Sequence, residues 1–445
     1  MFQQNTFARE CPCDIYEEAG TPCAGAYSMI RQLNSKYNGP LYQVRRSSDG
    51  QTKDIPQMDD GFADSKVQDD FLGGGGGTVS KLYDQSGNGN DLTVAKKGCY
   101  NCDQGDSACK DDKEANAKGR KLTVAGHTVY GLYIQPGEGY RTNQEGYAGH
   151  PDRVSAAKNM PTGNQAQGIY GVVDGKRPGQ ACCFNFGNGS TNNCYGPTGQ
   201  MNTLYFGGVD WWGTGAGRGP WFQNDMEAGV WAGGSANPPP KGWSTNPSIT
   251  WDYAFGISKT STENNRGKYC LRVADATNGD LTNAYDGDAP STWKMEGGIL
   301  LGIGGDNSNH SFGTFFEGCI TKGRPSNDID AKVLKNVQSM HYGSEAPVGT
   351  FLDARTASTP ASFSVRYIPS TASAIIRYSL ESARTINMRV FNQKGMQIET
   401  ITSGVKQAGG HVSIWNTKHA APGVYVVKTA IDGTTGWTDK IVVGR

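Results

Sequence analysis

The cysteines are the feature that most restricts how this chain can fold. All eleven lie between positions 11 and 319 of the 445 residues, and none follows. So many cysteines indicate an oxidising compartment and a fold that disulfides cross-link. Because their use stops abruptly, we expect one large cross-linked domain and then a smaller domain that is stable without them.

Short apolar runs between glycine-rich turns dominate the first 343 residues. Residues 128–134, 168–173 and 297–303 have the length and composition of β-strands. With 62 glycines and few long helical patterns, the composition is typical of a β-rich protein with many tight turns. We expect two helices, over residues 26–33 and 326–343, and the second has its apolar side chains on one face.

The composition changes after residue 343. Residues 344–362 are small, polar and punctuated by prolines, which indicates a linker. Residues 363–445 alternate apolar and polar side chains around short turns, which predicts a small Ig-like antiparallel β-sandwich. The predicted organisation is therefore a domain over 11–343, a linker over 344–362 and a second domain over 363–445.

Charge and hydropathy exclude several kinds of partner. The 42 basic and 42 acidic residues balance, so nucleic acid and anionic membranes are poor candidates and a neutral partner is favoured. Nine tryptophans and twenty tyrosines supply flat surfaces that suit sugar rings. No apolar run is long enough to span a membrane, and the first residues lack the pattern of a signal peptide. We expect that the chain begins at a mature boundary, with Met1 added.

Two adjacent cysteines, Cys182 and Cys183, raise a geometric question. Neighbouring Cα atoms lie about 3.8 Å apart, whereas disulfides prefer about 5.5–6 Å. A bond between the two would be strained, and strain collects at functional sites. The alternative is that each cysteine pairs elsewhere or is simply buried.

The other cysteines allow several pairings. Cys13 and Cys23 bracket a short loop and are expected to form a disulfide. The group at positions 99, 102 and 109 is expected to form disulfides rather than a zinc site, because no fourth ligand stands at the usual spacing. Cys270 and Cys319 lie in strand-like runs and are one candidate pair, although the sequence alone does not choose the connectivity. Since eleven is odd, at least one cysteine is left over, and the sequence does not assign Cys11 and Cys194.

Residues 209–231 combine carboxylates with glycines and tryptophans. If residues 220–227 form a strand, its period of two places Gln223, Asp225 and Glu227 on one face. Such a face can form the polar floor of a sugar groove, or it can be an ordinary solvated strand face.

A second carboxylate, Asp306, follows an apolar run and two glycines. Glycines at that point let a ligand approach the backbone closely. The alternative is an ordinary turn, because Asp and Asn are common turn residues. Glu296, Glu317 and Asp210 are further candidate carboxylates, and nothing in the local pattern ranks Asp306 above Glu317.

Five longer motifs occur in one order along the chain: CDIYEEAGTPC, KLYDQSGNGNDLT, ACCFNFGN, GAGRGPWFQNDMEAG and ILLGIGGDNSN. In these motifs, over roughly residues 11–343, the chain resembles the α-L-arabinofuranosidases of glycoside hydrolase family 54. The resemblance implies an all-β, jelly-roll-like β-sandwich. It also implies an enzyme that removes terminal α-L-arabinofuranosyl units from arabinan, arabinoxylan and related plant cell-wall polysaccharides, with retention of configuration and without a metal or other cofactor.

The resemblance also implies roles for individual residues. Glu227 matches the nucleophile and Asp306 the general acid/base. Cys182 and Cys183 match a vicinal disulfide that lies against the sugar. The remaining matches line the same pocket or flank the acid, and they are Trp212, Asp225, Gly305 and Asn307.

The chain departs from the family in several places. A short-loop disulfide of relatives, near residues 71–79, is missing, and the cysteines of 99–109 form an apparent insertion. Ala228 stands where relatives can carry a polar residue. The arabinose-binding β-trefoil of fungal relatives is also missing. Residues 363–445 instead resemble a C-terminal sorting domain of type IX secretion, which implies an extracellular or cell-surface location and the secretion machinery as a partner.

Three alternatives to this enzyme remain. The first is a lectin-like module that binds arabinose without cleaving its glycosides. The second is a structural protein of the cell surface, anchored by its tail. The third is another glycosidase specificity, for galactofuranose or xylose, on the same scaffold.

Overall fold

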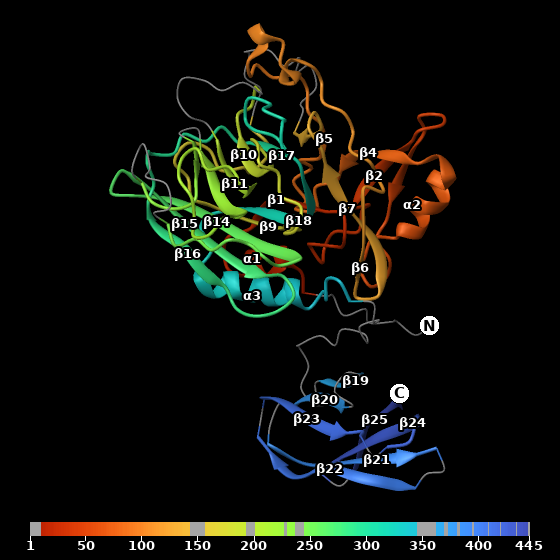
Figure 1. Cartoon of the computed structure of the whole chain (residues 1–445). Helices are drawn as coiled ribbons and strands as arrows, with labels where there is room; N and C mark the ends of the chain where they lie inside the picture. Colours follow the sequence, from red (N-terminus) through yellow and green to blue (C-terminus); the bar gives the residue numbers. More distant parts are fainter. Residues whose placement is uncertain are drawn as a thin grey trace. The chain divides into compact units, whose positions relative to one another are not determined.

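The chain forms two compact units in a computed structural model, residues Met1–Gly349 and Thr350–Arg445 (Figure 1). The structure describes residues 10–142, 156–192, 201–226, 229–235, 244–344, 362–368, 373–380, 383–393, 396–407, 409–418, 420–432 and 434–443. The boundary between the units falls within the predicted linker, most of which lies outside the described residues. The predicted domain limits stay a prediction.

The first unit contains two large antiparallel sheets. In the described part of the chain, one sheet has eight strands in the order β16-β15-β14-β9-β18-β7-β6, with β1 paired to β18. Its strands are β1 (Cys23–Ser28), β6 (Arg120–Val124), β7 (His127–Ile134), β9 (Gln167–Asp174), β14 (Tyr253–Glu263), β15 (Arg266–Asp275), β16 (Thr282–Asp288) and β18 (Gly313–Lys322).

The other sheet has ten described strands, in the order β13-β12-β11-β10-β17-β8-β5-β4-β2-β3. Its strands are β2 (Tyr42–Arg46), β3 (Thr52–Ile55), β4 (Gly77–Leu82), β5 (Leu92–Val94), β8 (Tyr140–Arg141), β10 (Asn185–Gly189), β11 (Asn202–Gly207), β12 (Trp221–Met226), β13 (Gly229–Trp231) and β17 (Gly298–Leu301). The strands expected over residues 128–134, 168–173 and 297–303 are confirmed as β7, β9 and β17.

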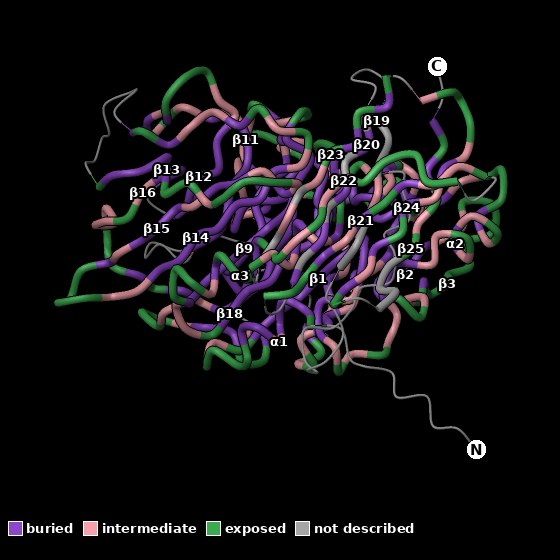
Figure 2. Tube along the Cα trace, turned by 90° about the horizontal axis from the view of Figure 1, so that it is seen from below, coloured by how far each residue is buried: buried purple, intermediate pink, exposed green. Residues whose placement is uncertain are grey.

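The two sheets pack face to face around an aromatic and aliphatic core. Phe186 of β10 contacts Phe315 of β18, with ring centroids 5.1 Å apart, and it meets Tyr27 of β1 edge-on at 6.1 Å. The central strand β9 is buried along its whole length, and buried residues continue along β14 and β18 (Figure 2). The predicted all-β sandwich is therefore confirmed.

Helices are few and short. They are α1 (Pro12–Glu18), α2 (Ser65–Leu72) and α3 (Asn327–Gln338), with 3-10 turns η1 (Gly73–Gly75), η2 (Cys102–Gln104) and η3 (Ser107–Cys109). The hydroxyl of Ser326 caps α3 by accepting a hydrogen bond from the amide of Ile329. Asp330 ties α3 to the eight-stranded sheet through Lys259 of β14 and Arg272 of β15. The helix expected over 326–343 is confirmed for 327–338. No helix in the described part of the chain has both the length and the apolarity to cross a membrane.

The helix predicted over residues 26–33 is wrong. Residues 23–28 form β1, which pairs with β18 so that Ala26 lies opposite Cys319 and Ser28 opposite Glu317. Every residue of β1 is buried. A short apolar run that is buried on both faces has no strand alternation, and such a run is easily mistaken for a helical segment.

The candidate bond between Cys270 and Cys319 does not form, because both cysteines are free. Cys270 lies on β15 and Cys319 on β18, and β14 and β9 lie between them in the sheet. Neighbouring strands are about 4.8 Å apart, so three strand spacings exceed the reach of a disulfide. Cys319 instead lies with its sulfur 3.6 Å from that of Cys13, which is bonded to Cys23.

The second unit contains two smaller sheets in the described residues. One is ordered β19-β20-β23 and the other β22-β21-β24-β25. Their strands are β19 (Ser362–Ile368), β20 (Ser373–Leu380), β21 (Arg384–Asn392), β22 (Gln397–Lys406), β23 (Gly409–Asn416), β24 (Gly423–Ile431) and β25 (Thr434–Val443). Ile386, Met388 and Val390 alternate into a shared core with Trp415, as the sequence pattern predicted. The small C-terminal β-domain is thus present.

Candidate active site

A pocket of about 600 Å³ opens beside the ten-stranded sheet, and we call it the active-site pocket. Six residues that the sequence singled out line it, and they are Cys182, Cys183, Trp212, Asp225, Gly305 and Asp306. The structure therefore brings together residues from three segments that are far apart in the chain. Glu227 lies outside the described residues, but its described neighbours Met226 and Gly229 both line the pocket.

Asp225 is held on the floor of the pocket by β12. Its carboxylate accepts a 2.7 Å hydrogen bond from the Nδ2 of Asn185 on β10, across the intervening strand β11, and the residue is only 2% exposed. A carboxylate oxygen of Asp225 lies within 4.8 Å of the sulfurs of Cys182 and Cys183. Because Asp225 is buried, the alternative of an ordinary solvated strand face is wrong for this residue.

The cysteines at positions 182 and 183 are joined in a disulfide that forms part of the pocket wall. Cys183 packs against Tyr205, Val209 and Val230 beneath it. Trp212 closes over the same side, where a Cβ on Gly229 would lie 2.4 Å from its indole ring. Only glycine lets the ring approach the backbone so closely.

Asp306 occupies a tight turn after β17. Its Oδ1 accepts a 3.0 Å hydrogen bond from the amide of Ser308, so it is a turn residue as well as a pocket residue. Burial raises the pKa of its carboxyl group above the ordinary value, while the hydrogen bonds from Ser308 oppose the shift. The result is a carboxyl group that holds its proton more tightly than an exposed aspartate.

The acid and the sulfurs converge on one short stretch of backbone. A Cβ on Gly304 would lie 3.2 Å from Oδ1 of Asp306 and 3.4 Å from Sγ of Cys183. The hydroxyl of Ser308 lies 3.6 Å from Sγ of Cys183, while its amide binds Asp306. The pocket thus combines a protonatable carboxyl group, a buried carboxylate and an apolar sulfur surface.

The two residues that flank Asp306 are used differently. The amide of Gly305 contacts the sulfur of Met201 at 3.1 Å, and Gly305 lines the pocket. Asn307 is fully buried, and its side chain donates a 3.0 Å hydrogen bond to Asp112, behind the turn. Its predicted contact with the sugar stays a prediction, and the structure gives Asn307 a role in holding the turn.

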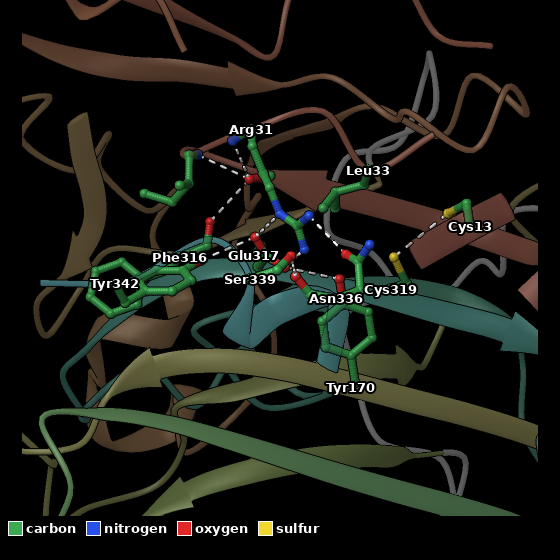
Figure 3. Close-up of polar contacts among 12 residues, drawn as sticks. Cys13, Arg31, Leu33, Tyr170, Phe316, Glu317, Cys319, Asn336, Ser339 and Tyr342 are labelled. Atoms are coloured by element: carbon green, nitrogen blue, oxygen red, sulfur yellow. Dashed lines mark hydrogen bonds and ion pairs between the residues drawn. The ribbon is translucent and has the colours of Figure 1, made fainter. Parts of the chain in front are cut away.

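The rival carboxylates, Glu317, Glu296 and Asp210, are not among the described pocket residues. Glu317 is fully buried on β18 and accepts two 2.7 Å hydrogen bonds from the guanidinium of Arg31 (Figure 3). The hydroxyl of Tyr342 donates a third, at 3.0 Å. Glu317 is therefore a structural ion-pair residue, which local sequence could not distinguish from Asp306.

Two clusters of three cysteine or acidic side chains lie within 4.8 Å in the described residues. One contains Cys13 and Cys23 with Cys319, and the other contains Cys182 and Cys183 with Asp225. In each cluster two of the sulfurs are already joined in a disulfide, so they offer no thiolate to a metal.

Several described residues that line the pocket were not indicated by any sequence pattern. The residues concerned are Tyr100, Asn101, Asp106, Met201, Ser308 and His310. The disulfide expected among the cysteines at 99–109 is present between Cys102 and Cys109. Nothing in the sequence pattern linked this loop to the turn that contains Asp306.

Comparison with known proteins places this geometry in a family. Residues 12–343 match the model of the catalytic part of α-L-arabinofuranosidase B. The chain belongs to the α-L-arabinofuranosidase B family. It is 37% identical over 391 residues to a probable α-L-arabinofuranosidase B of Aspergillus fumigatus, which covers 85% of this chain and 72% of that relative. An α-L-arabinofuranosidase of Hypocrea jecorina is 37% identical over 384 residues, with 85% and 71% covered.

Solved structures of the arabinofuranosidase family have the same fold. One, a family 54 α-L-arabinofuranosidase soaked with a cyclic sulfate inhibitor, is 35% identical with a TM-score of 0.67. Another, an arabinofuranosidase complexed with arabinofuranosyl-α-1,2-xylobiose, is 34% identical with a TM-score of 0.66. Each match covers 85% of this chain and 74% of the solved chain.

Proposed function

We propose that the protein is a retaining α-L-arabinofuranosidase that hydrolyses terminal α-L-arabinofuranosyl residues of arabinan, arabinoxylan and related plant polysaccharides. The observation that carries the proposal is the meeting of Asp306, Asp225 and the Cys182–Cys183 disulfide in one pocket. The complex of a relative with arabinofuranosyl-α-1,2-xylobiose supports an arabinofuranoside as the ligand.

Glu227 is the proposed nucleophile. Its ionised carboxylate attacks C1 of the sugar, the bond from C1 to the glycosidic oxygen breaks, and a glycosyl-enzyme forms. Water then attacks C1 and releases Glu227, so two inversions give net retention. Met226 and Gly229 are the nearest described residues before and after Glu227 in the chain, and they support this role because both line the pocket.

Asp306 is the proposed acid/base. Because burial raises the pKa of its carboxyl group, it keeps a proton at a pH where an exposed aspartate is ionised. It gives that proton to the departing oxygen and later takes one from the attacking water. This chemistry requires the two carboxyl groups to be about 5–5.5 Å apart.

The other pocket residues bind the sugar. The buried carboxylate of Asp225 is proposed to accept hydrogen bonds from sugar hydroxyls, which compensate for its burial. The disulfide of Cys182 and Cys183 offers a weakly polar surface on which a furanose ring packs, with Trp212 beside it.

We also propose that the protein acts outside the cell. The disulfides Cys13–Cys23 and Cys102–Cys109 support an oxidising compartment. The C-terminal unit is proposed to be a sorting domain that a secretion machinery recognises. Deleting residues 363–445 from the gene should then leave the enzyme inside the producing cell, and unchanged export would contradict this part of the proposal.

A substrate panel tests the function. The wild-type protein should release arabinose from nitrophenyl α-L-arabinofuranoside and from arabinan, but act far less on galactofuranosides or xylosides. Proton NMR should show that the first-formed arabinose keeps the α configuration. Glu227→Gln should lose hydrolysis, whereas the matched control Asp111→Asn, which changes an exposed acid outside the pocket, should not. A wild-type protein that binds arabinan and releases no arabinose would instead be a lectin-like module.

A further inference from the structure

The loop of residues 99–109, which we call the cystine loop, forms one wall of the active-site pocket. It contains η2 and η3, and the Cys102–Cys109 disulfide closes it. Three of its residues, Tyr100, Asn101 and Asp106, line the pocket. The proposed nucleophile, Asp225 and the paired sulfurs all come from other segments, so this wall is a separate element of the site.

The cystine loop is attached to the turn that contains Asp306. The amides of Cys99 and Tyr100 both donate hydrogen bonds of 3.3 Å to the backbone carbonyl of Asp306. The hydroxyl of Ser107 donates a 2.6 Å hydrogen bond to the side chain of Asn309. The loop therefore lies directly beside the residue that is proposed to protonate the leaving oxygen.

Tyr100 and Asp106 of the cystine loop both contact His310, and all three residues line the pocket. The ring of Tyr100 packs edge-on against the ring of His310, with centroids 5.6 Å apart. The Nε2 of His310 lies 3.1 Å from a carboxylate oxygen of Asp106, while its side chain remains 40% exposed. The backbone amide of His310 binds the carbonyl of Cys182. The backbone of His310 is thus held in place, while its side chain stays accessible to a ligand.

We propose that Tyr100, with His310 and Asp106, binds the sugar on the leaving-group side of the scissile bond. This inference rests on the proposed function. Asp306 must touch the glycosidic oxygen, so the arabinofuranosyl unit lies toward Asp225 and the sulfurs. The remainder of the glycan then leaves past the Asp306 turn, along the cystine loop.

The chemistry of the wall suits such a ligand. A tyrosine ring offers a flat apolar face to the C–H groups of a sugar, and the His310–Asp106 pair offers a donor and an acceptor to its hydroxyls. Pockets of about 300–1,000 Å³ hold drug-sized ligands, so a pocket of about 600 Å³ has room for more than one pentose. The ligand class is therefore an oligosaccharide or polysaccharide chain that carries arabinofuranosyl branches.

Two substrates separate this role from a general effect on catalysis. Arabinofuranosyl-α-1,2-xylobiose has a leaving sugar, whereas methyl α-L-arabinofuranoside has none but still needs the proton from Asp306. Tyr100→Ala and His310→Ala should each lower kcat/KM on the trisaccharide by about tenfold and change it less than about twofold on the methyl glycoside. Tyr100→Phe, which keeps the ring, should stay close to wild type. The matched control is Tyr83→Ala, which removes a half-buried tyrosine away from the pocket.

The outcomes are distinct. An equal loss on both substrates would mean that Tyr100 and His310 position Asp306, and it would overturn the inference. So would Tyr100→Ala and His310→Ala variants that behave like Tyr83→Ala. Activity on the methyl glycoside also shows that each variant has folded. A wild-type protein that cleaves neither substrate would overturn the proposed function itself, and this inference with it.

Discussion

The carboxylate of Asp225 accepts a 2.7 Å hydrogen bond from Nδ2 of Asn185, which joins the pocket floor to the middle of the ten-stranded sheet. A hydrogen bond to a buried charged group contributes about 1.5–3 kcal/mol. The pair connects a buried acid of the pocket to strand β10 of this sheet.

The first prediction follows from this bond. Asn185→Ala should lower kcat/KM for arabinofuranosides by about tenfold or more, because Asp225 loses a partner that orients it. The matched control is Asn188→Ala on the same strand, whose side chain binds Gln167 away from the pocket. That control should reduce stability and leave kcat/KM near wild type. If both variants lose activity equally, the bond to Asp225 has no special role.

The paired sulfurs give a second prediction. Replacing Cys182 and Cys183 together by serine should raise KM by about tenfold. The apolar sulfur surface is then replaced by hydroxyls, which bind water that the sugar must displace. Replacing Cys13 and Cys23 together should instead cost about 3 kcal/mol of stability and leave KM unchanged. Steady-state kinetics and urea unfolding separate the two effects. Equal KM values for the wild type and the first variant would remove the sulfurs from the binding site.

Asp306 gives a third prediction, on pH. Its carboxyl group must be protonated to act as an acid, and its pKa is raised, mainly by burial. Activity on methyl α-L-arabinofuranoside should therefore fall as the pH rises through this raised pKa. Asp306→Asn should lower kcat/KM, which reports the glycosylation step, by about 10²–10⁴-fold on that substrate. The loss should be much smaller with a nitrophenyl leaving group, which departs without a proton, and equal losses on both would contradict the assignment.

The buried ion pair of Arg31 and Glu317 gives a fourth prediction. Glu317→Gln should destabilise the first unit by about 3–5 kcal/mol, because it leaves the buried guanidinium without a counter-charge. The matched control is Asp70→Asn, which breaks the exposed pair with Lys66 and should cost less than about 1 kcal/mol. Protein that remains folded should keep its kcat. Loss of turnover with unchanged urea unfolding would instead make Glu317 a catalytic candidate again.

Asp112, behind the Asp306 turn, gives a fifth prediction. Burial raises its pKa to about 7, although hydrogen bonds from Asn309 and Asn307 and the charge of Arg141 oppose the shift. The unfolded chain has an ordinary aspartate with a pKa of about 3.9, so the folded state binds the proton more tightly. The contribution of Asp112 to the stability of the fold should therefore decrease as the pH rises from about 4 to 7, by an amount on the order of a few kcal/mol.

Urea unfolding at a series of pH values measures how the free energy of unfolding changes with pH, which is the slope in question. The free energy of unfolding of the wild type minus that of Asp112→Asn should decrease across this range, since the amide has no proton to lose. Asp111→Asn changes the exposed neighbour, which pairs with Lys96, and should keep the slope. A difference between wild type and Asp112→Asn that stays constant from pH 4 to 7 would contradict the raised pKa of Asp112.

The sequence predicted most of the sheets because glycine-bounded apolar runs such as β7 and β9 have a clear local signal. It failed at β1, whose hydrogen-bonded partner β18 lies almost 300 residues away and whose residues are all buried, so that no alternation marks the strand. The motifs led to Asp306 and to the paired cysteines. They did not reveal Tyr100 or His310, because the contact between the cystine loop and the Asp306 turn is purely tertiary.

The disulfides of the first unit have a practical consequence for production of the protein. Cys182–Cys183 lines the pocket, Cys102–Cys109 closes the loop that forms one of its walls, and Cys13–Cys23 joins α1 to β1 in the sandwich itself. A chain made in a reducing host cytoplasm would therefore lack the sulfur surface of the pocket and the closed cystine loop, and its sandwich would lose the stabilisation from Cys13–Cys23. Such a preparation should gain activity on later exposure to a glutathione redox buffer.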